Sequence, residues 1–152
     1  MNKKEKLVII SDSREPFGLY NFSNFPDTMI IRDNLNVGDF SVYPYEKELC
    51  IERKTICDLS GSFTSGRERF EAEWKRSESY ICKFLLIEGA FFDILSGNYK
   101  SKFSVNSFLG TLLSWSVKYR FSTIFVKTPR EGSTAVYWIC REFVNLKKKG
   151  EI

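Results

Sequence analysis

Histidine is absent from this chain of 152 residues, and this absence excludes more chemistry than any other feature of its composition. Without histidine there is no Ser-His-Asp or Cys-His catalysis, no histidine general base and no histidine metal ligand. If the chain is an enzyme, it must work with carboxylates, lysine, arginine, tyrosine or serine. If it binds a metal, the ligands are oxygen atoms, which favours magnesium or manganese over zinc.

Long apolar segments are missing as well. The longest apolar runs, such as Phe84–Ile87, are far too short to cross a bilayer. The basic start, Met1–Lys6, precedes a strand-like run and lacks both the apolar length and the cleavage site of a signal peptide. We therefore expect an intracellular protein, cytoplasmic or nucleoid-associated (nuclear in a eukaryote), with no contact to a membrane.

Cysteine is scarce, and its spacing indicates no metal or disulfide framework. None of the four cysteines has CxxC spacing, and each has apolar or core-like neighbours: Cys50, Cys57, Cys82 and Cys140. This pattern favours buried free thiols over disulfides or a zinc site.

Linkers, repeats and low-complexity segments are also lacking, so we expect a single domain over residues 1–152. Apolar residues make up 43% of the chain and aromatic residues 16%, which is typical of a globular domain with a core. The net charge of +4 is compatible with a polyanionic partner but does not demonstrate one.

Short apolar runs come first in the sequence and then alternate with amphipathic segments. The hydrophobic periodicity predicts strands at 6–11, 28–32, 40–44, 49–54, 83–87 and 123–126, and helices at 67–82, 91–95, 105–119 and from 128 to about 149. The segment 58–66, which is rich in serine and glycine, is expected to be a loop or a broken helix. This order predicts an α/β fold in which helices flank a mixed central sheet.

The predicted hairpin at 40–54 carries polar residues where an interior strand should not have them. Because side chains alternate along a strand, Glu52 and Lys54 share one face while Arg53 takes the other. With a turn centred between residues 46 and 47, Asp39 opposes Lys54 and lies diagonal to Glu52, about 7–8 Å away at the backbone. Two such carboxylates repel each other, and a shared divalent cation relieves that repulsion.

These groups are the ones that phosphodiester hydrolysis needs. A metal activates water and stabilises the developing charge, and the ammonium of Lys54 can orient a water molecule or neutralise a phosphate. On these residues alone, an ordinary hairpin with Glu52 and Lys54 as a surface ion pair is equally compatible with the sequence.

The wider sequence resembles the nuclease domain of the XPF/Hef-type structure-specific endonucleases. Gly38-Asp39, followed by Glu52-Arg53-Lys54-Thr55-Ile56-Cys57-Asp58, is similar to their Gly-Asp…Glu-Arg-Lys-x-x-x-Asp signature. Asp12-Ser13-Arg14-Glu15 resembles their Asp-x-Arg-Glu element, residues 59–70 resemble the segment after the signature, and Ile87-Glu88-Gly89 resembles a later strand end. The elements occur in the family's order from about residue 7 to residue 145.

The resemblance implies a restriction-endonuclease-like core that uses a divalent metal. The expected cofactor is Mg2+, with Mn2+ able to substitute, and no small-molecule cofactor is expected. The resemblance implies that Asp39 and Glu52 are metal ligands and that Lys54 is the catalytic lysine.

The resemblance also implies functional roles for four further residues. Asp12 is expected as a catalytic carboxylate, either a third metal ligand or an acceptor behind the ligands. Arg14 is expected to hold a phosphate with its guanidinium fork. Arg53, which belongs to the same catalytic signature, faces away from Glu52, so we expect it to pair with Asp58 and brace the strand end.

Three residues outside those roles are also candidates for the site. Gly38 is expected to support the site structurally, together with Asp58. Arg67 and Arg69, just after the flexible segment, can contact DNA phosphates at a helix start, although a solvated helix face explains them equally well.

The expected function is that of a magnesium-dependent endonuclease acting on branched, flapped or otherwise structured DNA, in repair or recombination. Two alternatives stay open: a non-catalytic DNA-binding subunit of a nuclease complex, and a small restriction or junction-resolving enzyme with the same core. No helix-hairpin-helix or helicase module accompanies the domain, so further DNA contacts must come from this domain, a second subunit or a partner.

The two C-terminal helical segments predict a homodimer or one half of a heterodimer. The segment 105–119 is apolar over a broad face, and the segment 134–146 carries Tyr137 and Trp138 outside its apolar stripe. A helix with apolar groups on more than one face usually packs on more than one side. The alternative is that both helices only cover the sheet.

Overall fold

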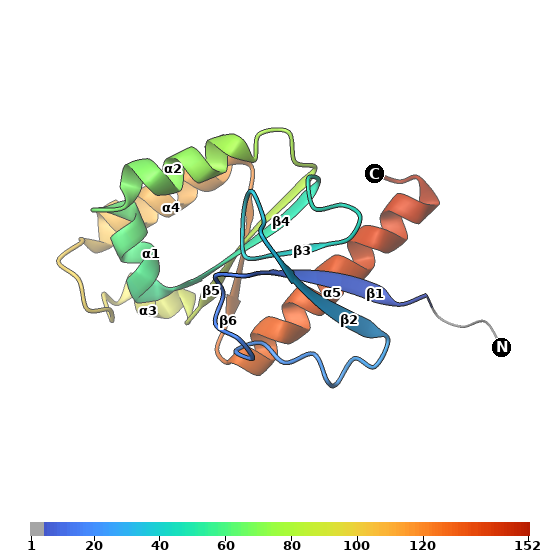
Figure 1. Cartoon of the computed structure of the whole chain (residues 1–152). Coiled ribbons are helices and arrows are strands. Elements are labelled where there is room, and N and C mark those ends of the chain that lie inside the picture. The colour runs from blue at the N-terminus through green and yellow to red at the C-terminus, as the bar shows by residue number, and fades with distance from the viewer. Residues whose placement is uncertain (1–4) are drawn as a thin grey trace.

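The computed structural model describes residues 5–152, and the first four residues of the basic start lie outside the described part. Six strands form one mixed sheet in the order β2-β1-β3-β4-β5-β6 (Figure 1). Strand β3 is antiparallel to both of its neighbours, and the remaining pairs are parallel. The strands are β1 (Leu7–Asp12), β2 (Thr28–Asp33), β3 (Phe40–Val42), β4 (Leu49–Thr55), β5 (Cys82–Glu88) and β6 (Ser122–Val126).

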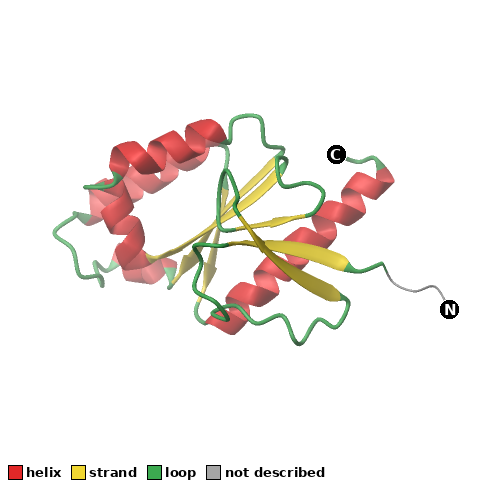
Figure 2. Ribbon diagram, viewed as in Figure 1, coloured by secondary structure: helices red, strands yellow, loops and turns green. Residues whose placement is uncertain are grey.

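Helices cover both faces of this sheet, as Figure 2 shows. The helices are α1 (Ile56–Phe63), α2 (Arg67–Arg76), α3 (Phe91–Leu95), α4 (Val105–Tyr119) and α5 (Pro129–Lys149). Helices α1, α2 and α4 enclose one core, in which Phe63, Trp74 and Phe108 are almost completely buried. Helix α5 closes a second core on the opposite face, against β1, β3, β5 and β6. The expected α/β architecture is therefore confirmed.

Local sequence signals account for the helix ends. The Thr128 hydroxyl accepts a hydrogen bond from the Glu131 backbone N–H, and the Glu131 carboxylate accepts one from the Thr128 backbone N–H, so α5 begins with a capping box. Pro129 follows at the first helical position, and Gly150 ends the helix in the left-handed conformation with φ +68°. Capping and burial thus agree on where α5 starts and stops.

The helices before β5 differ from the sequence expectation. Of the two alternatives expected for residues 58–66, a loop or a broken helix, the structure has the broken helix: residues 58–63 belong to α1 and residues 64–66 form the turn before α2. Helix α1 forms because Thr55 caps its first turn and because Ile56, Leu59 and Phe63 bury one face. Helix α2 ends at Arg76 rather than at residue 82, and the hydroxyl of the buried Ser77 donates to the Trp74 carbonyl at 2.6 Å. A side chain that binds the last turn of a helix competes with its continuation.

The hairpin register also differs from the expectation. Phe40 lies opposite Ile51, which shifts the pairing by two residues from that of a turn centred between residues 46 and 47. The connection is asymmetric, since the carbonyl of Tyr45 accepts hydrogen bonds from both the Glu48 and the Leu49 backbone. A shift by two residues preserves which side chains share a face, so Glu52 and Lys54 still point to one side.

The cysteines are free, but one of them was placed wrongly. Cys50 and Cys140 are buried and Cys82 is half-buried, whereas Cys57 is exposed at the first turn of α1. Ile56 and Asp58, which flank Cys57, lie on the buried and the exposed face of α1. The sequence around Cys57 did not show which of these faces the cysteine shares.

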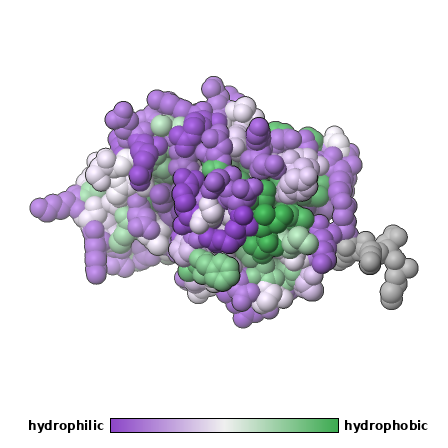
Figure 3. Space-filling model, in the orientation of Figure 1, coloured by the Kyte–Doolittle hydropathy of each residue, from purple (hydrophilic) through white to green (hydrophobic). Residues whose placement is uncertain are grey.

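The surface is largely hydrophilic, with one apolar area in view. In Figure 3 green atoms gather over the part of the sheet that β1, β2 and β3 form. Three consecutive residues of β2, namely Met29, Ile30 and Ile31, are exposed apolar residues of this part of the sheet. Within residues 5–152, no helix has the length and apolar character to cross a bilayer.

Candidate active site

A pocket of about 480 Å³ lies where the end of β4 meets α1 and α2. It gathers most of the acidic and basic side chains that the sequence singled out. Its lining residues are Glu15, Asp39, Glu52, Arg53, Lys54, Cys57, Asp58, Gly61, Ser62, Ser65, Gly66, Arg69, Phe70 and Glu73.

The turn at Gly38 and Asp39 is held by the backbone on several sides. Gly38 has φ +81°, and a Cβ there would come within 3.0 Å of the Ile51 carbonyl oxygen, so glycine is required. The Asp39 backbone N–H donates to that same carbonyl at 2.8 Å, and its own carbonyl accepts from the Asp12 N–H at 2.8 Å. The Asp39 carboxylate accepts from the Arg53 backbone N–H at 2.7 Å, which aims it along β4.

Glu52 and Lys54 point into the pocket from the same face of β4. The Glu52 residue is only 6% exposed. The Lys54 ammonium lies 3.6 Å from a Glu52 carboxylate oxygen and 4.9 Å from the centroid of the Phe70 ring, so it is held between an anion and an aromatic face. The predicted trio of Asp39, Glu52 and Lys54 is thus brought together.

Burial and neighbouring negative charges raise the pKa of both carboxyl groups. Burial raises the pKa of Asp39 to about 7, and the negative charges of Glu15 and Glu73 add to this shift. Burial also raises the pKa of Glu52 well above its ordinary value, followed by the charges of Asp39 and Glu73. Without a cation, this environment favours the protonated form of the two carboxyl groups. A divalent cation bound by both would favour their ionised form.

The donor set fits a hard cation. Asp39 and Glu52 offer carboxylate oxygen atoms, the ligands that Mg2+ and Mn2+ prefer. Among residues 5–152 no three acidic or cysteine side chains are close enough together to enclose a metal. Asp39 and Glu52 are the side chains that would hold such a cation.

Arg53 turns to the opposite side of β4 and ties three segments together. Its guanidinium donates to Glu15 at 2.7 Å and to Glu88 at 3.1 Å. The Tyr20 hydroxyl donates to Glu88 at 2.9 Å, and the Tyr20 ring lies 5.8 Å from the guanidinium carbon. A Cβ at Gly132 of α5 would lie 2.1 Å from the Tyr20 hydroxyl, so this network packs closely against that helix.

The expected pairing of Arg53 with Asp58 is wrong. Asp58 lies exposed in the first turn of α1, where its backbone N–H donates to the Thr55 hydroxyl at 3.1 Å. Alternation along β4 sends Arg53 toward α5, whereas α1 begins on the other face. Asp58 lines the pocket rim instead, beside Cys57.

Asp12 and Arg14 form an ion pair with each other, and neither residue lines the pocket. The Asp12 carboxylate, in a residue only 1% exposed, accepts from the Arg14 guanidinium at 2.8 Å and from the Leu35 N–H at 2.8 Å. Burial acts to raise the pKa of Asp12, but the hydrogen bonds from Arg14 and Leu35 hold it below its ordinary value. The metal-ligand role of Asp12 and the phosphate role of Arg14, whose side chain is largely exposed, stay predictions.

The two arginines in the first turn of α2 have different environments. Arg69 lines the pocket. The Arg67 guanidinium donates to the Phe63 carbonyl at 3.3 Å and to the Thr111 hydroxyl at 3.4 Å, and it lies over the Trp115 ring at 5.1 Å. Arg69 is therefore free to meet a ligand in the pocket, whereas Arg67 joins α2 to α4.

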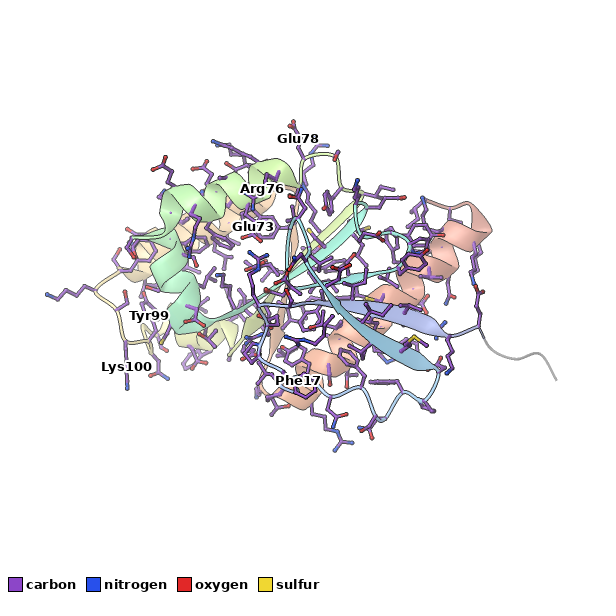
Figure 4. All side chains as sticks on the ribbon, in the orientation of Figure 1. Phe17, Glu73, Arg76, Glu78, Tyr99 and Lys100 are labelled. Atoms are coloured by element: carbon purple, nitrogen blue, oxygen red, sulfur yellow. The ribbon has the colours of Figure 1, made fainter. Side chains whose placement is uncertain are left out.

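Sequence reasoning gave no role to Glu15, Glu73 or Glu88. Figure 4 shows Glu73 on the side of α2 that faces the sheet, where its carboxylate accepts from the Gly38 N–H at 3.0 Å. A signal was present, since Glu73 lies three residues after Phe70 and directly before Trp74, both of them buried. A charged residue at the edge of an apolar helix stripe faces the interior of the domain.

Comparisons with known proteins agree with this geometry. The sequence model of the ERCC4 domain family matches residues 12–139. The chain is 38% identical over 86 residues to the DNA repair endonuclease UVH1 of Arabidopsis thaliana, a match that covers 57% of this chain and 9% of that protein. The chain thus spans about a tenth of the length of this curated relative.

Two solved structures from Aeropyrum pernix share the fold. XPF superposes with a TM-score of 0.70 at 19% identity, over 95% of this chain and 69% of that one. XPF in complex with DNA superposes with a TM-score of 0.69 at 18% identity, over 92% and 66% of the two chains. This similarity supports the restriction-endonuclease-like core expected from the sequence.

Proposed function

Because this chain belongs to the ERCC4 domain family and has an XPF-type nuclease fold, we propose that it is a metal-dependent endonuclease that hydrolyses phosphodiester bonds in branched, flapped or otherwise structured DNA. One observation carries the proposal: the half-buried Asp39 and the buried Glu52 place two carboxyl groups beside Lys54 in an open pocket, where the pKa of each is raised. A buried repulsive pair costs stability and is typical of a functional site.

The proposal assigns a role to four residues of the pocket. Asp39 and Glu52 would hold Mg2+, or Mn2+ in its place, and the chemistry supplied by that cation would be Lewis-acid activation of water. The Lys54 ammonium, fixed by Glu52 and Phe70, neutralises a phosphate oxygen or orients the attacking water. Arg69 at the pocket wall contacts the DNA backbone.

The decisive experiment is a nicking assay in Mg2+ with plain, flapped and branched duplexes. We expect Asp39→Asn and Glu52→Gln to abolish cleavage while the fold is retained, because each removes one anion from the shared cation site. Glu68→Gln, an exposed change on α2, is the matched control. Near-normal cleavage by either site variant, or equal cleavage of all three duplexes, would contradict the respective half of the proposal.

A non-catalytic DNA-binding subunit is the alternative function. It would bind structured DNA without nicking in Mg2+ or Mn2+. The retained Asp39, Glu52 and Lys54 argue against it, because a subunit without chemistry gains nothing from a buried repulsive pair.

The proposed partners are structured DNA and a second subunit, either a copy of this chain or a related one. The apolar residues Leu113 and Val117 of α4 are 54% and 79% exposed, and Trp138 of α5 is 53% exposed. A contact along the sheet edge at β6, which α4 precedes and α5 follows in the chain, would bury these residues. Sedimentation at micromolar concentration is expected to show a dimer, alone or with a related partner, and a monomer that cleaves at a rate first order in protein would contradict this.

A further inference from the structure

One side chain from outside the hairpin reaches the turn that carries Asp39. Glu73 belongs to α2, and its carboxylate oxygen Oε1 accepts a hydrogen bond from the Gly38 backbone N–H at 3.0 Å. On either side of Glu73 along the helix, Phe70 is 4% and Trp74 is 1% exposed, so the helix is anchored where Glu73 leaves it. The contact therefore joins a rigid helix to the residue before the predicted metal ligand.

The Gly38 N–H depends on this side chain. The neighbouring backbone groups of the turn have partners within the sheet: the Asp39 N–H donates to Ile51, and the Asp39 carbonyl accepts from Asp12. Gly38 itself is in a left-handed conformation, with φ +81°, which directs its N–H away from this ladder and toward α2. A part-buried N–H that loses its acceptor drives the local backbone to find another one.

A small movement of this turn would displace the Asp39 carboxylate from the position that a cation site requires. Its carboxylate is aimed by the Arg53 backbone N–H at 2.7 Å, and Mg2+ tolerates only a narrow range of oxygen distances, about 2.0–2.1 Å. Groups that orient a metal ligand from behind commonly change metal affinity or activity by about 10–100-fold when they are removed.

We propose that Glu73 is a positioning residue that holds the Gly38–Asp39 turn and, through it, the Asp39 carboxylate in place to share a divalent cation with Glu52. The inference rests on the proposed function and deepens it. The role requires an acceptor oxygen at this position, and it does not require the negative charge of Glu73. This distinction separates positioning from direct participation of a third carboxylate.

Two substitutions test that distinction. Glu73→Gln keeps an oxygen that can accept from Gly38, whereas Glu73→Met keeps the bulk and the helix propensity but has no comparable acceptor. Glu73→Ala is a second non-accepting variant in case the methionine disturbs the packing. Glu68→Ala is the control, because Glu68 lies exposed on the same helix and outside the pocket lining.

The readouts include two that need no turnover. The first is the affinity for Ca2+ or Tb3+ by calorimetry or luminescence, and the second is the chemical shift and exchange rate of the Gly38 amide by NMR. We expect Glu73→Met and Glu73→Ala to weaken cation affinity by about tenfold or more and to expose the Gly38 amide to exchange. Nicking should fall at fixed Mg2+ and recover in part at high Mg2+. Glu73→Gln is expected to keep the Gly38 amide protected as in the unsubstituted protein. It should lose clearly less cation affinity and nicking than Glu73→Met or Glu73→Ala, because it removes a charge near the site but keeps the acceptor oxygen.

Three results would overturn the proposal. If Glu73→Gln is as impaired as Glu73→Met while both remain folded, the charge and not the acceptor matters. If Glu73→Met and Glu73→Ala bind cation normally, the turn does not depend on α2. If the unsubstituted protein binds no divalent cation, the metal-dependent function fails, and this inference fails with it; in the first two results the function itself stands.

Discussion

Consecutive residues of β4 serve two clusters that each contain two carboxylates and one cation, but the charges are paired differently in the two clusters. On one side, Asp39 and Glu52 face each other in the pocket with Lys54 as the nearest cation. On the other side, Arg53 is held by Glu15 and Glu88, and these side chains are 11–18% exposed. The first set has more negative charge than its surroundings satisfy, whereas the second pairs its guanidinium with carboxylates through short hydrogen bonds.

The Arg53 cluster stabilises the fold, whereas the Asp39–Glu52 pair lowers its stability. Paired charges with good hydrogen-bond geometry join the loop after β1 to the ends of β4 and β5. The unpaired carboxylates lower stability in the absence of a cation, and two well-packed cores offset this cost. Three substitutions break or sharpen this comparison.

The largest effect on stability is expected from Arg53→Ala. It leaves Glu15 and Glu88 as part-buried carboxylates without their common partner, which typically lowers the free energy of unfolding by about 3–5 kcal/mol. Denaturant unfolding measures this loss, with Arg69→Ala as the control at an arginine of the open pocket. A loss no larger than that of Arg69→Ala would show that the Arg53 network does not brace the strands.

A smaller effect, on rate and not on stability, is expected from Lys54→Ala. Loss of a cation beside the reacting phosphate should slow nicking by roughly 10²-fold, which corresponds to about 2.7 kcal/mol. DNA binding by Lys54→Ala, measured in Ca2+, should change little. The control is Lys47→Ala, at an exposed lysine of the hairpin loop, and its DNA binding should also change little. A variant that cuts normally but binds poorly would reassign Lys54 to anchoring of the DNA backbone.

The smallest effect is expected from pH in the absence of metal. Burial raises the pKa of Asp39 from 3.8 to about 7, so between these values the folded protein keeps a proton that the unfolded chain releases. The contribution of Asp39 to stability therefore falls as the pH rises from about 4 to about 7. Asp39→Asn removes this penalty, so its Tm should exceed that of the unsubstituted protein by a margin that grows over this range to a few degrees.

Two controls complete the pH experiment. Asp33→Asn, on the exposed edge strand, should show no such growth in its Tm difference. Added Mg2+ should reduce the advantage of Asp39→Asn at pH 8, because the cation stabilises the ionised carboxylates only where both are present. A Tm difference that stays constant with pH would mean that Asp39 titrates normally in the folded protein.

Much of the fold was predictable because the patterns that carry it are local. Alternation along β4 assigned Glu52 and Lys54 to one face and Arg53 to the other, and the structure agrees. The stripe and caps of α5 likewise predicted its start at Pro129 and its end at Gly150. The trio of Asp39, Glu52 and Lys54 followed from the signature and from the hairpin.

The remaining features depend on contacts between segments that lie far apart in the sequence. The partners of Arg53 are 38 and 35 residues away, and spacing alone does not rank Glu15 or Glu88 above the nearer Asp58. Glu73 meets Gly38 across 35 residues. Helix α1 was underestimated because Ser60 and Gly61 are poor helix formers, and burial of Leu59 and Phe63 outweighs that propensity.

The alternation along β4 also determines which changes of length the chain can tolerate. One residue inserted within Glu52–Lys54 exchanges the two faces for every residue on one side of the insertion, so Glu52 and Lys54 would no longer point to the same side of the strand. One residue inserted in the connection 43–48 leaves both faces unchanged, because the strands on either side keep their own pairing. Length variation among descendants of this sequence should therefore concentrate in the connection and be absent from the strand.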